Sequence, residues 1–257
     1  MCTVTIQRNE CLLRVTVNRD ELRGRPAEGP PEIFETDEGC WAGPRDPAGG
    51  GTWMGVNDRG VVACLLNRYL KPPPDRQPGG GERPSRGAIV PECLRRGDAE
   101  LAVEWLSRSF DPSPYADFTL VVASGCAVWE FGWDGGGQLQ ERSLPLEWEI
   151  LSSSSWCQQD VIAWRRSAFE QWREDGSPFA GALPLYHLLQ PPDRAQWAPL
   201  MRRDRSATWS ITQARVNADP GPAHMLYWPV EGLDPHAPAA EITLARRESV
   251  SYLGPRA

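Results

Sequence analysis

Cys2 is the residue at the start of this chain whose chemistry is most distinctive. If the initiator methionine is removed, Cys2 carries a free α-amine and a thiol on the same residue. The reference pKa is about 7.7–8.0 for an α-amine and about 8.5 for a thiol, so the amine can act as a base for the thiol. One residue then supplies both nucleophile and base, and no histidine is needed. We therefore expect Met1 to be removed and Cys2 to be a nucleophile, although a lone cysteine at this position is usually an ordinary side chain.

Two predicted strands would position charged residues beside Cys2. Residues 3–6 and 13–18 alternate apolar and polar side chains, and residues 8–10 between them are typical of a turn. Such a hairpin brings Arg19 and Asp20 near Cys2. There the guanidinium favours the thiolate and the carboxylate can hold the ammonium. Without that geometry, residues 19–21 are a solvated charge run.

Several motifs along the chain resemble a known family. The runs Met1-Cys2-Thr3-Val4, Asn18-Arg19-Asp20-Glu21 and Gly50-Gly51-Thr52-Trp53-Met54-Gly55-Val56-Asn57 resemble the NRDE family, which includes the transport and Golgi organisation protein 2 of eukaryotes. Further matches are Gly60, Asn67, Ser85-Arg86-Gly87 and Arg205-Ser206-Ala207-Thr208. The resemblance extends from Cys2 to about Tyr227 and is strongest over the first 90 residues.

This resemblance implies a fold and a set of site residues. The implied fold is α+β, a four-layer αββα sandwich of two antiparallel sheets between helical layers, like that of the N-terminal-nucleophile hydrolases. We expect it to form a single domain over residues 1–257. A more distant similarity to choloylglycine hydrolases and penicillin V acylases assigns the nucleophile to Cys2, with Arg19, Asp20 and Asn67 completing the site.

The chain departs from its relatives at Ser153. Relatives commonly have Leu-Ser-Asn after a strand, and that asparagine resembles an oxyanion donor, whereas this chain has Leu151-Ser152-Ser153-Ser154-Ser155. A serine hydroxyl donates one hydrogen bond but is shorter than an amide. Loss of an oxyanion donor typically costs about 10²–10³ in rate. We expect compensation by a neighbouring group or weaker catalysis.

Three other residues are candidates for substrate contact. Arg205 could approach the thiol or bind a substrate carboxylate; alternatively, it is a surface arginine in an arginine-rich run. Trp53 and Trp156 could line an apolar substrate cleft, although most of the twelve tryptophans are expected to fill the core. The segments 39–51 and 71–84 are rich in glycine and proline, so neither is predicted to form a helix or strand. The second segment is either a lid over the site or a passive linker.

The remaining sequence predicts strands and helices in an order that suits two sheets between helical layers. Residues 61–67 are expected to form a central strand, and 118–123 with 127–133 a hairpin. Helices are expected at 85–96, 98–110 and 159–174, with a short one at 181–189. Further strands are expected at 148–152, 207–216, 224–229 and 241–245.

Composition excludes several classes of protein. The net charge of −7 and the pI of about 5.1 argue against nucleic acid as a main partner. The sequence has no apolar run of 18 residues and no readable secretory signal, so we expect no membrane span and a cytoplasmic location. The seven cysteines are scattered without a CxxC motif, which predicts free thiols and no metal site. No cofactor is expected.

Two functions remain open at this point. The first is a cysteine amidohydrolase or thioesterase that acts on a small-molecule substrate through Cys2, with Asn67 and Ser153 at the oxyanion. The second is a non-catalytic factor on the same scaffold that handles an apolar ligand such as lipid or haem, or that acts in trafficking. The sequence leaves the substrate and the oligomeric state open.

Overall fold

Two antiparallel sheets form the body of the protein, whose computed structural model describes residues 2–69, 83–144, 147–217 and 221–247. The six-stranded sheet has the order β10 (Glu147–Ser152), β1 (Cys2–Arg8), β2 (Leu12–Leu22), β13 (Ser206–Asn217), β14 (Ala223–Pro229), β15 (Ala240–Leu244). The seven-stranded sheet has the order β3 (Glu32–Thr36), β4 (Gly39–Gly43), β5 (Met54–Asn57), β6 (Val62–Asn67), β7 (Phe118–Ala123), β8 (Val128–Trp133), β9 (Gln140–Ser143). A small hairpin pairs β11 (Phe179–Ala180) with β12 (Leu183–Pro184).

The main core lies between the two sheets. Alternate residues of β1, such as Val4 and Ile6, pack with residues of β5 and β6, such as Met54 and Cys64. The period-two alternation of these strands therefore buries one set of side chains against the facing sheet. The predicted central strand is confirmed, because β6 is the middle strand of its sheet.

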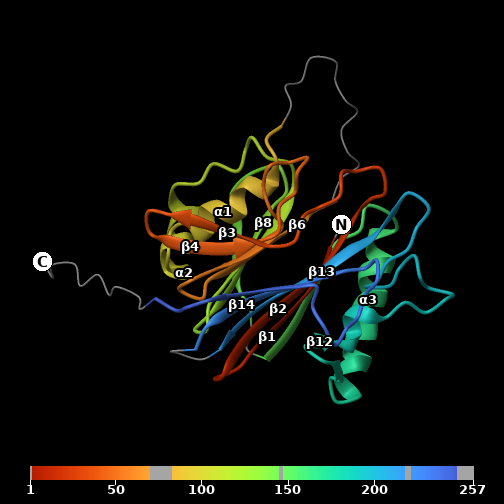
Figure 1. The fold of residues 1–257 in the computed structure, drawn as a ribbon. Coiled ribbons are helices and arrows are strands. Elements are labelled where there is room, and N and C mark those ends of the chain that lie inside the picture. Colours follow the sequence, from red (N-terminus) through yellow and green to blue (C-terminus); the bar gives the residue numbers. More distant parts are fainter. Residues whose placement is uncertain (1, 70–82, 145–146, 218–220, 248–257) are drawn as a thin grey trace, which may run out of the picture.

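Helices lie on the outer faces of the sheets. A 3-10 turn (Arg86–Ala88), α1 (Ile89–Leu94) and α2 (Ala99–Arg108) pack on the seven-stranded sheet. Helix α3 (Gln158–Glu174) and a 3-10 turn (Leu185–Leu188) lie beside β10. Figure 1 shows α1 and α2 on one side of the molecule and α3 on the opposite side. The mixed α/β class and the antiparallel sheets agree with the expected fold, but helices are few in the described residues, and four complete layers are not established.

The structure corrects several local predictions. The glycine-rich segment 39–51 begins with a strand, β4, because its glycines fit beside a neighbouring backbone: a Cβ on Gly43 would lie 2.6 Å from the carbonyl oxygen of Met54. Strand β3 was not predicted. The segment 181–189 contains β12 and a 3-10 turn instead of a helix. Most of the segment 71–84 lies outside the described residues, so its two alternatives stay open.

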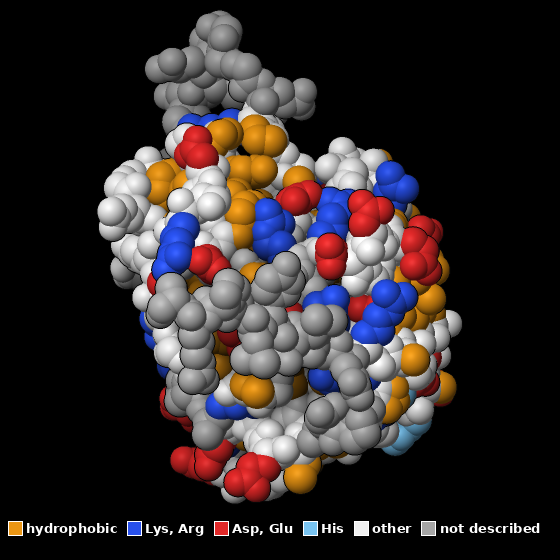
Figure 2. All heavy atoms as spheres, turned by 90° about the vertical axis from the view of Figure 1, so that its left-hand side faces the viewer, with side chains coloured by type: hydrophobic (Ala, Val, Ile, Leu, Met, Phe, Trp, Pro, Cys, Tyr) orange, Lys and Arg blue, Asp and Glu red, His pale blue; other side chains and the backbone are white. Residues whose placement is uncertain are grey.

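Other features of the described residues bear on partners and ligands. None of their helices is long and apolar enough to cross a membrane. All seven cysteines are free, and no cluster of three or more potential metal ligands occurs within the described part. On the face of the molecule in Figure 2, basic and acidic side chains are interspersed.

Candidate active site

The side chain of Cys2 lies at the start of β1 and lines a cavity of about 690 Å³. It is 7% exposed and belongs to the core between the sheets. Residues from distant parts of the sequence line the cavity with it: Arg19, Asp20, Glu21, Arg25, Asp46, Ala48, Gly49, Thr52, Trp53, Leu65, Asn67, Arg83, Pro84, Ser85, Arg86, Gly87, Ala116. Most of these residues are polar or charged, so the cavity is not the apolar cleft that the tryptophans suggested.

The hairpin of β1 and β2 places the two predicted charged residues on opposite faces of the sheet. Cys2 is the cross-strand partner of Arg19. Directly paired residues share a face, so Arg19 lies on the side of Cys2 that faces the other sheet. The next residue, Asp20, has its side chain on the opposite face, where it meets Arg165 of α3. Both residues are thus near Cys2, as the hairpin predicted, but in different surroundings.

Acidic side chains surround the guanidinium of Arg19. It forms ion pairs with Glu28 and Glu21, and Asp46 lies 3.9 Å from Nη2. Its carbon Cζ also lies 4.5 Å from the centre of the Trp53 ring, within the range of a cation–π contact. Arg19 therefore has several partners other than the Cys2 thiol.

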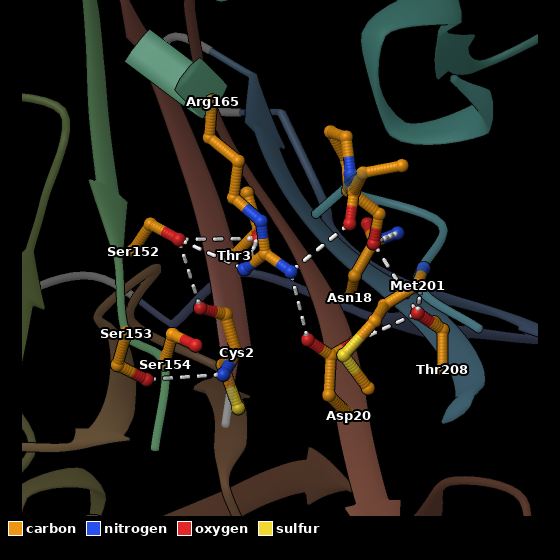
Figure 3. A network of polar contacts seen from close by, with 12 residues as sticks. Cys2, Thr3, Asn18, Asp20, Ser152, Ser153, Ser154, Arg165, Met201 and Thr208 are labelled. Atoms are coloured by element: carbon orange, nitrogen blue, oxygen red, sulfur yellow. Dashed lines mark hydrogen bonds and ion pairs between the residues drawn. The ribbon is translucent and has the colours of Figure 1, made fainter. Parts of the chain in front are cut away.

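A network of hydrogen bonds around Arg165 holds Asp20 (Figure 3). Arg165 is fully buried, and its Nη2 lies 3.3 Å from Asp20 Oδ2. Its Nη1 donates to the hydroxyls of Thr3 at 2.7 Å and Ser152 at 2.9 Å. Its remaining donors reach the carbonyls of Trp197 and Ala198. One side chain thereby joins α3 to β1, β2 and β10.

Sequence reasoning missed Arg165, although a signal was present. Arg165 lies four residues from both Val161 and Phe169 on the predicted helix, and these side chains share one helix face. Val161 and Phe169 are buried. A charged residue on an apolar stripe needs a buried partner, and Asp20 is that partner.

A β-bulge next to the site gives Asp20 and Arg19 different partners on β13. The register shifts between Thr208, opposite Asp20, and Ser210, opposite Arg19. Thr208 donates a hydrogen bond of 2.7 Å to Asp20. Ser210 donates to Glu28, which also binds Arg19. Residues two apart in a regular strand share a face, so the bulge allows these two hydroxyls to serve opposite faces.

Ser153 contacts the backbone of Cys2. The Cys2 nitrogen donates to the Ser153 hydroxyl at 3.1 Å, and the Ser153 nitrogen donates to the Cys2 carbonyl at 3.0 Å. The hydroxyl thus accepts a hydrogen bond from the nitrogen that becomes the α-amine if Met1 is removed. This differs from the predicted arrangement, in which Ser153 donates to an oxyanion.

Asn67 ends β6 and lines the cavity with Cys2. It also lines a smaller cavity of about 200 Å³ together with Ser153, so the structure brings these two residues together. The Asn67 amide donates to the Tyr69 hydroxyl at 3.1 Å. A carboxamide at the cavity wall is available to a bound substrate if it exchanges that partner.

Two predicted contact residues lie outside the cavity. Arg205 is exposed at the turn before β13, so the surface-arginine alternative describes its position. Trp156 is 45% exposed, and Arg203 lies over its ring with Cζ 5.1 Å from the ring centre. Trp53, in contrast, is buried and lines the cavity.

Electrostatics at Cys2 oppose the expected activation. Burial raises the pKa of the Cys2 thiol, and the Asp20 carboxylate adds to the rise. The positive charge of the chain's N-terminus and that of Arg19 act in the opposite direction without prevailing. Burial also raises the pKa of the Asp20 carboxyl group, an effect that Arg165 opposes. Arg19 lowers the pKa of the thiol, as expected, but desolvation by burial outweighs this effect and the pKa lies above its ordinary value.

Comparison with solved structures identifies the fold. An N-acylethanolamine-hydrolyzing acid amidase orthologue from Caenorhabditis elegans is similar over 83% of this chain and 92% of its own, with 12% identity and a TM-score of 0.56. A mutant of the conjugated bile acid hydrolase from Clostridium perfringens is similar over 99% and 100%, with 10% identity and a TM-score of 0.51. The scaffold is therefore that of the N-terminal-nucleophile hydrolases.

The sequence then gives the family. The pattern of the family described as Transport and Golgi organisation 2 matches residues 1–160. The chain belongs to this family, as its motifs predicted. A search of curated proteins found no match.

Proposed function

We propose that this protein is an N-terminal cysteine hydrolase that cleaves an amide or acyl-thioester bond of a small molecule. The observation that carries the proposal is the position of Cys2. Its thiol lines a cavity of about 690 Å³, and its nitrogen lies 3.1 Å from the Ser153 hydroxyl. Removal of Met1 would place an α-amine at this nitrogen, beside the thiol that it must deprotonate. The similarity of the fold to that of known hydrolases also supports the proposal.

The proposed reaction follows from the groups around Cys2. The α-amine takes the thiol proton while Sγ forms a bond to the acyl carbonyl carbon. The tetrahedral intermediate collapses, the bond to the leaving nitrogen or sulfur breaks, and the ammonium returns the proton to that atom. Water then attacks the acyl-cysteine with the amine as base, which releases the acid and restores the thiol.

Three neighbours have proposed roles in this sequence. Asn67 donates a hydrogen bond to the oxyanion, and Ser153 holds the α-amine. Asp20, held by Arg165 and Thr208, contributes negative potential that favours the ammonium. Arg19 holds the cavity wall through its carboxylate partners and Trp53. We further propose that the chain forms one domain and that its sheets and helices make the four-layer sandwich of this fold.

The experiment that tests the proposal combines processing and turnover. Intact mass should show that Met1 is absent from protein made with its native start. A panel of acyl-amides and acyl-thioesters should include substrates that wild type hydrolyses and Cys2→Ala does not. Cys157→Ala is the matched control, because Cys157 is exposed and lies outside the described cavities. Retention of Met1 in the bulk of the protein, or equal activity of Cys2→Ala, would refute the hydrolase.

One observation favours the alternative, a protein that binds a ligand without turning it over. Burial raises the pKa of the Cys2 thiol, so little thiolate forms near neutral pH while Met1 is present. A carrier would bind members of the same panel with a measurable dissociation constant and release them unchanged. The panel therefore separates the two functions.

A further inference from the structure

Charged side chains dominate the wall of the Cys2 cavity, and most of them are paired. Arg19 forms an ion pair with Glu28, and Arg25 forms one with Asp46 at 2.6 Å. Glu21 lies within 4.0 Å of both of these guanidinium groups. These two arginines are therefore neutralised by the protein itself.

Arg86 is a half-buried arginine of this wall with a different environment. Its Nη1 donates to the backbone carbonyl of Asp117 at 2.8 Å. Within the described residues it forms no ion pair with a carboxylate. Burial lowers the pKa of its guanidinium and Arg25 adds to this, while Tyr69, Asp117 and Cys2, when ionised, act to raise it. A guanidinium stays charged at neutral pH, so Arg86 is a partly desolvated cation that no carboxylate approaches within 4.0 Å in the part of the chain that the structure describes.

Backbone contacts join the segment of Arg86 to the turn that carries Trp53, another residue of the cavity wall. The Thr52 nitrogen donates to the carbonyl of Gly87, the next residue, at 3.1 Å. Gly51 and Gly87 touch so closely that a Cβ on Gly51 would lie 2.3 Å from the Gly87 carbonyl carbon. The turn that carries Trp53 is thus joined to the segment that carries Arg86. The backbone that carries Arg86 is therefore anchored to this turn.

We propose that Arg86 forms an anion-binding subsite beside Cys2, which recognises a carboxylate or phosphate on the substrate. The substrate class that follows from this subsite rests on the proposed hydrolase function. Binding of an anion beside Cys2 does not depend on that function. A guanidinium with one donor used by Asp117 retains others for an anionic oxygen, and charged hydrogen bonds of this kind are strong. The substrate is thus an acyl compound with an anionic group near the scissile carbonyl.

Two alkylating reagents test the subsite without any turnover. Iodoacetate and iodoacetamide both react when the thiolate Sγ attacks the methylene carbon, forming an S–C bond as iodide leaves with the electrons of the C–I bond. They differ in one group, a carboxylate against a neutral amide. The rates at Cys2 are measured by peptide mapping after timed quenching, with exposed Cys157 as the internal reference.

Arg86→Gln should lower the iodoacetate rate at Cys2 by about tenfold or more, the effect of losing a hydrogen-bonded charge partner. The iodoacetamide rate should stay within about twofold. Arg86→Lys keeps the charge and should retain part of the preference. Arg95→Gln is the matched control, because Arg95 lies on the surface at the end of α1 and outside the cavity.

Competing ions identify the anion. Succinate and inorganic phosphate are added separately to the alkylation of wild type and of Arg86→Gln. Protection of Cys2 by succinate alone indicates a carboxylate subsite. Protection by phosphate alone indicates a phosphate subsite. In either case the protection should be absent in Arg86→Gln. Equal slowing of both reagents in Arg86→Gln, or an unchanged iodoacetate rate in both Arg86 variants, would overturn the proposal.

A substrate pair connects the subsite to the proposed function. Succinyl and butyryl thioesters of one thiol differ by a carboxylate in place of a methyl group, and wild type should prefer the succinyl compound by about tenfold. Hydrolysis without such a preference would refute the subsite and leave the hydrolase intact. An Arg86-dependent alkylation preference without hydrolysis of any substrate would refute the hydrolase and leave the subsite intact.

Discussion

At the scale of single residues, Cys2 is subject to opposing influences. Its burial raises the pKa of the thiol, while the positive charge of the chain's N-terminus, Arg19 and the Asp20 backbone N–H favour the thiolate. The nitrogen of Cys2 lies next to the thiol and, as an ammonium, would be a cation adjacent to Sγ. Removal of Met1 thus moves the N-terminal ammonium onto Cys2 itself, next to the thiol.

The first prediction concerns this change. The midpoint of the pH dependence of Cys2 alkylation by iodoacetamide should lie above pH 9.0 while Met1 is present, because burial raises the thiol pKa above 9.0. It should fall in protein that begins at Cys2, because a cation on the same residue favours the thiolate. Comparing a fusion before and after proteolysis to expose Cys2 measures both. Identical profiles would show that the amine does not act on the thiol.

Ser153 gives a second prediction at this scale. Its hydroxyl accepts a hydrogen bond from the Cys2 nitrogen. Ser153→Ala removes this acceptor and should lower turnover by a few-fold to about tenfold, the worth of one hydrogen bond. Ser153→Asn replaces the hydroxyl by the amide that the resemblance leads one to expect at this position. The turnover of this variant should equal or exceed that of wild type. Ser143→Ala, at an exposed position of β9, is the control, and a loss of equal size there would argue against the contact.

At the scale of elements, β2 and β13 sort the polar residues onto two faces. Alternation along β2 directs Arg19 toward the cavity and Asp20 toward α3. The bulge in β13 places the Thr208 hydroxyl against Asp20 and the Ser210 hydroxyl against Glu28, the ion-pair partner of Arg19. The side chain of Asn18 lies on the same face of the sheet as that of Asp20. Its amide donates to the carbonyls of His187 and Pro199. The strand therefore anchors the segments that cover its outer face.

The third prediction tests the anchor formed by α3. Arg165→Met should lower the free energy of unfolding by about 3–5 kcal/mol, because it leaves the Asp20 carboxyl group buried without its cation. Denaturant unfolding measures the loss. The deficit should shrink as the pH falls, since protonation removes the charge on Asp20. Arg166→Met, its exposed neighbour on α3, should change stability by less than about 1 kcal/mol.

The fourth prediction concerns His187, which is fully buried against β2. Burial lowers the pKa of His187 from 6.5 to about 3. The unfolded chain therefore binds a proton below pH 6.5 that the folded chain does not. Stability is lost as the pH falls from about 6.5 toward 3, by up to about 1.4 kcal/mol per pH unit from this residue. His187→Asn should flatten that slope, whereas His236→Gln, at an exposed position, should keep the slope of the parent.

At the scale of the whole molecule, the cavity forms where residues of the two sheets lie next to the contact between Gly51 and Gly87. Cys2 comes from the six-stranded sheet and Asn67 from the seven-stranded sheet. The segments of Trp53 and Arg86 are joined by the contact between Gly51 and Gly87. Neither sheet alone forms the wall.

The fifth prediction addresses this contact. Gly51→Ala places a methyl group 2.3 Å from backbone, so the two segments must separate. We expect a loss of about 1–3 kcal/mol in stability and a weaker Arg86-dependent preference at Cys2. Gly24→Ala is the matched control, because no atom of the described residues lies within 4 Å of a Cβ there. Equal stability of both variants would show that the contact can relax without cost.

The sequence by itself determined the family, the hairpin and the candidate nucleophile. Strict alternation specifies strands locally, and the motifs around Cys2 and Asn18 lie close together in the chain, so short-range pattern was sufficient. It also placed the strand that ends at Asn67, because a continuous apolar run is typical of a strand buried on both faces.

Only the tertiary structure decided what surrounds these residues. Burial raised the pKa of Cys2 against the local effect of Arg19, since desolvation depends on every element packed around the thiol. The partner of Asp20 comes from a helix more than a hundred residues away, and Arg86 reaches the cavity through a contact between two distant glycines. Such relationships depend on long-range packing, which is not encoded in the spacing of neighbouring residues.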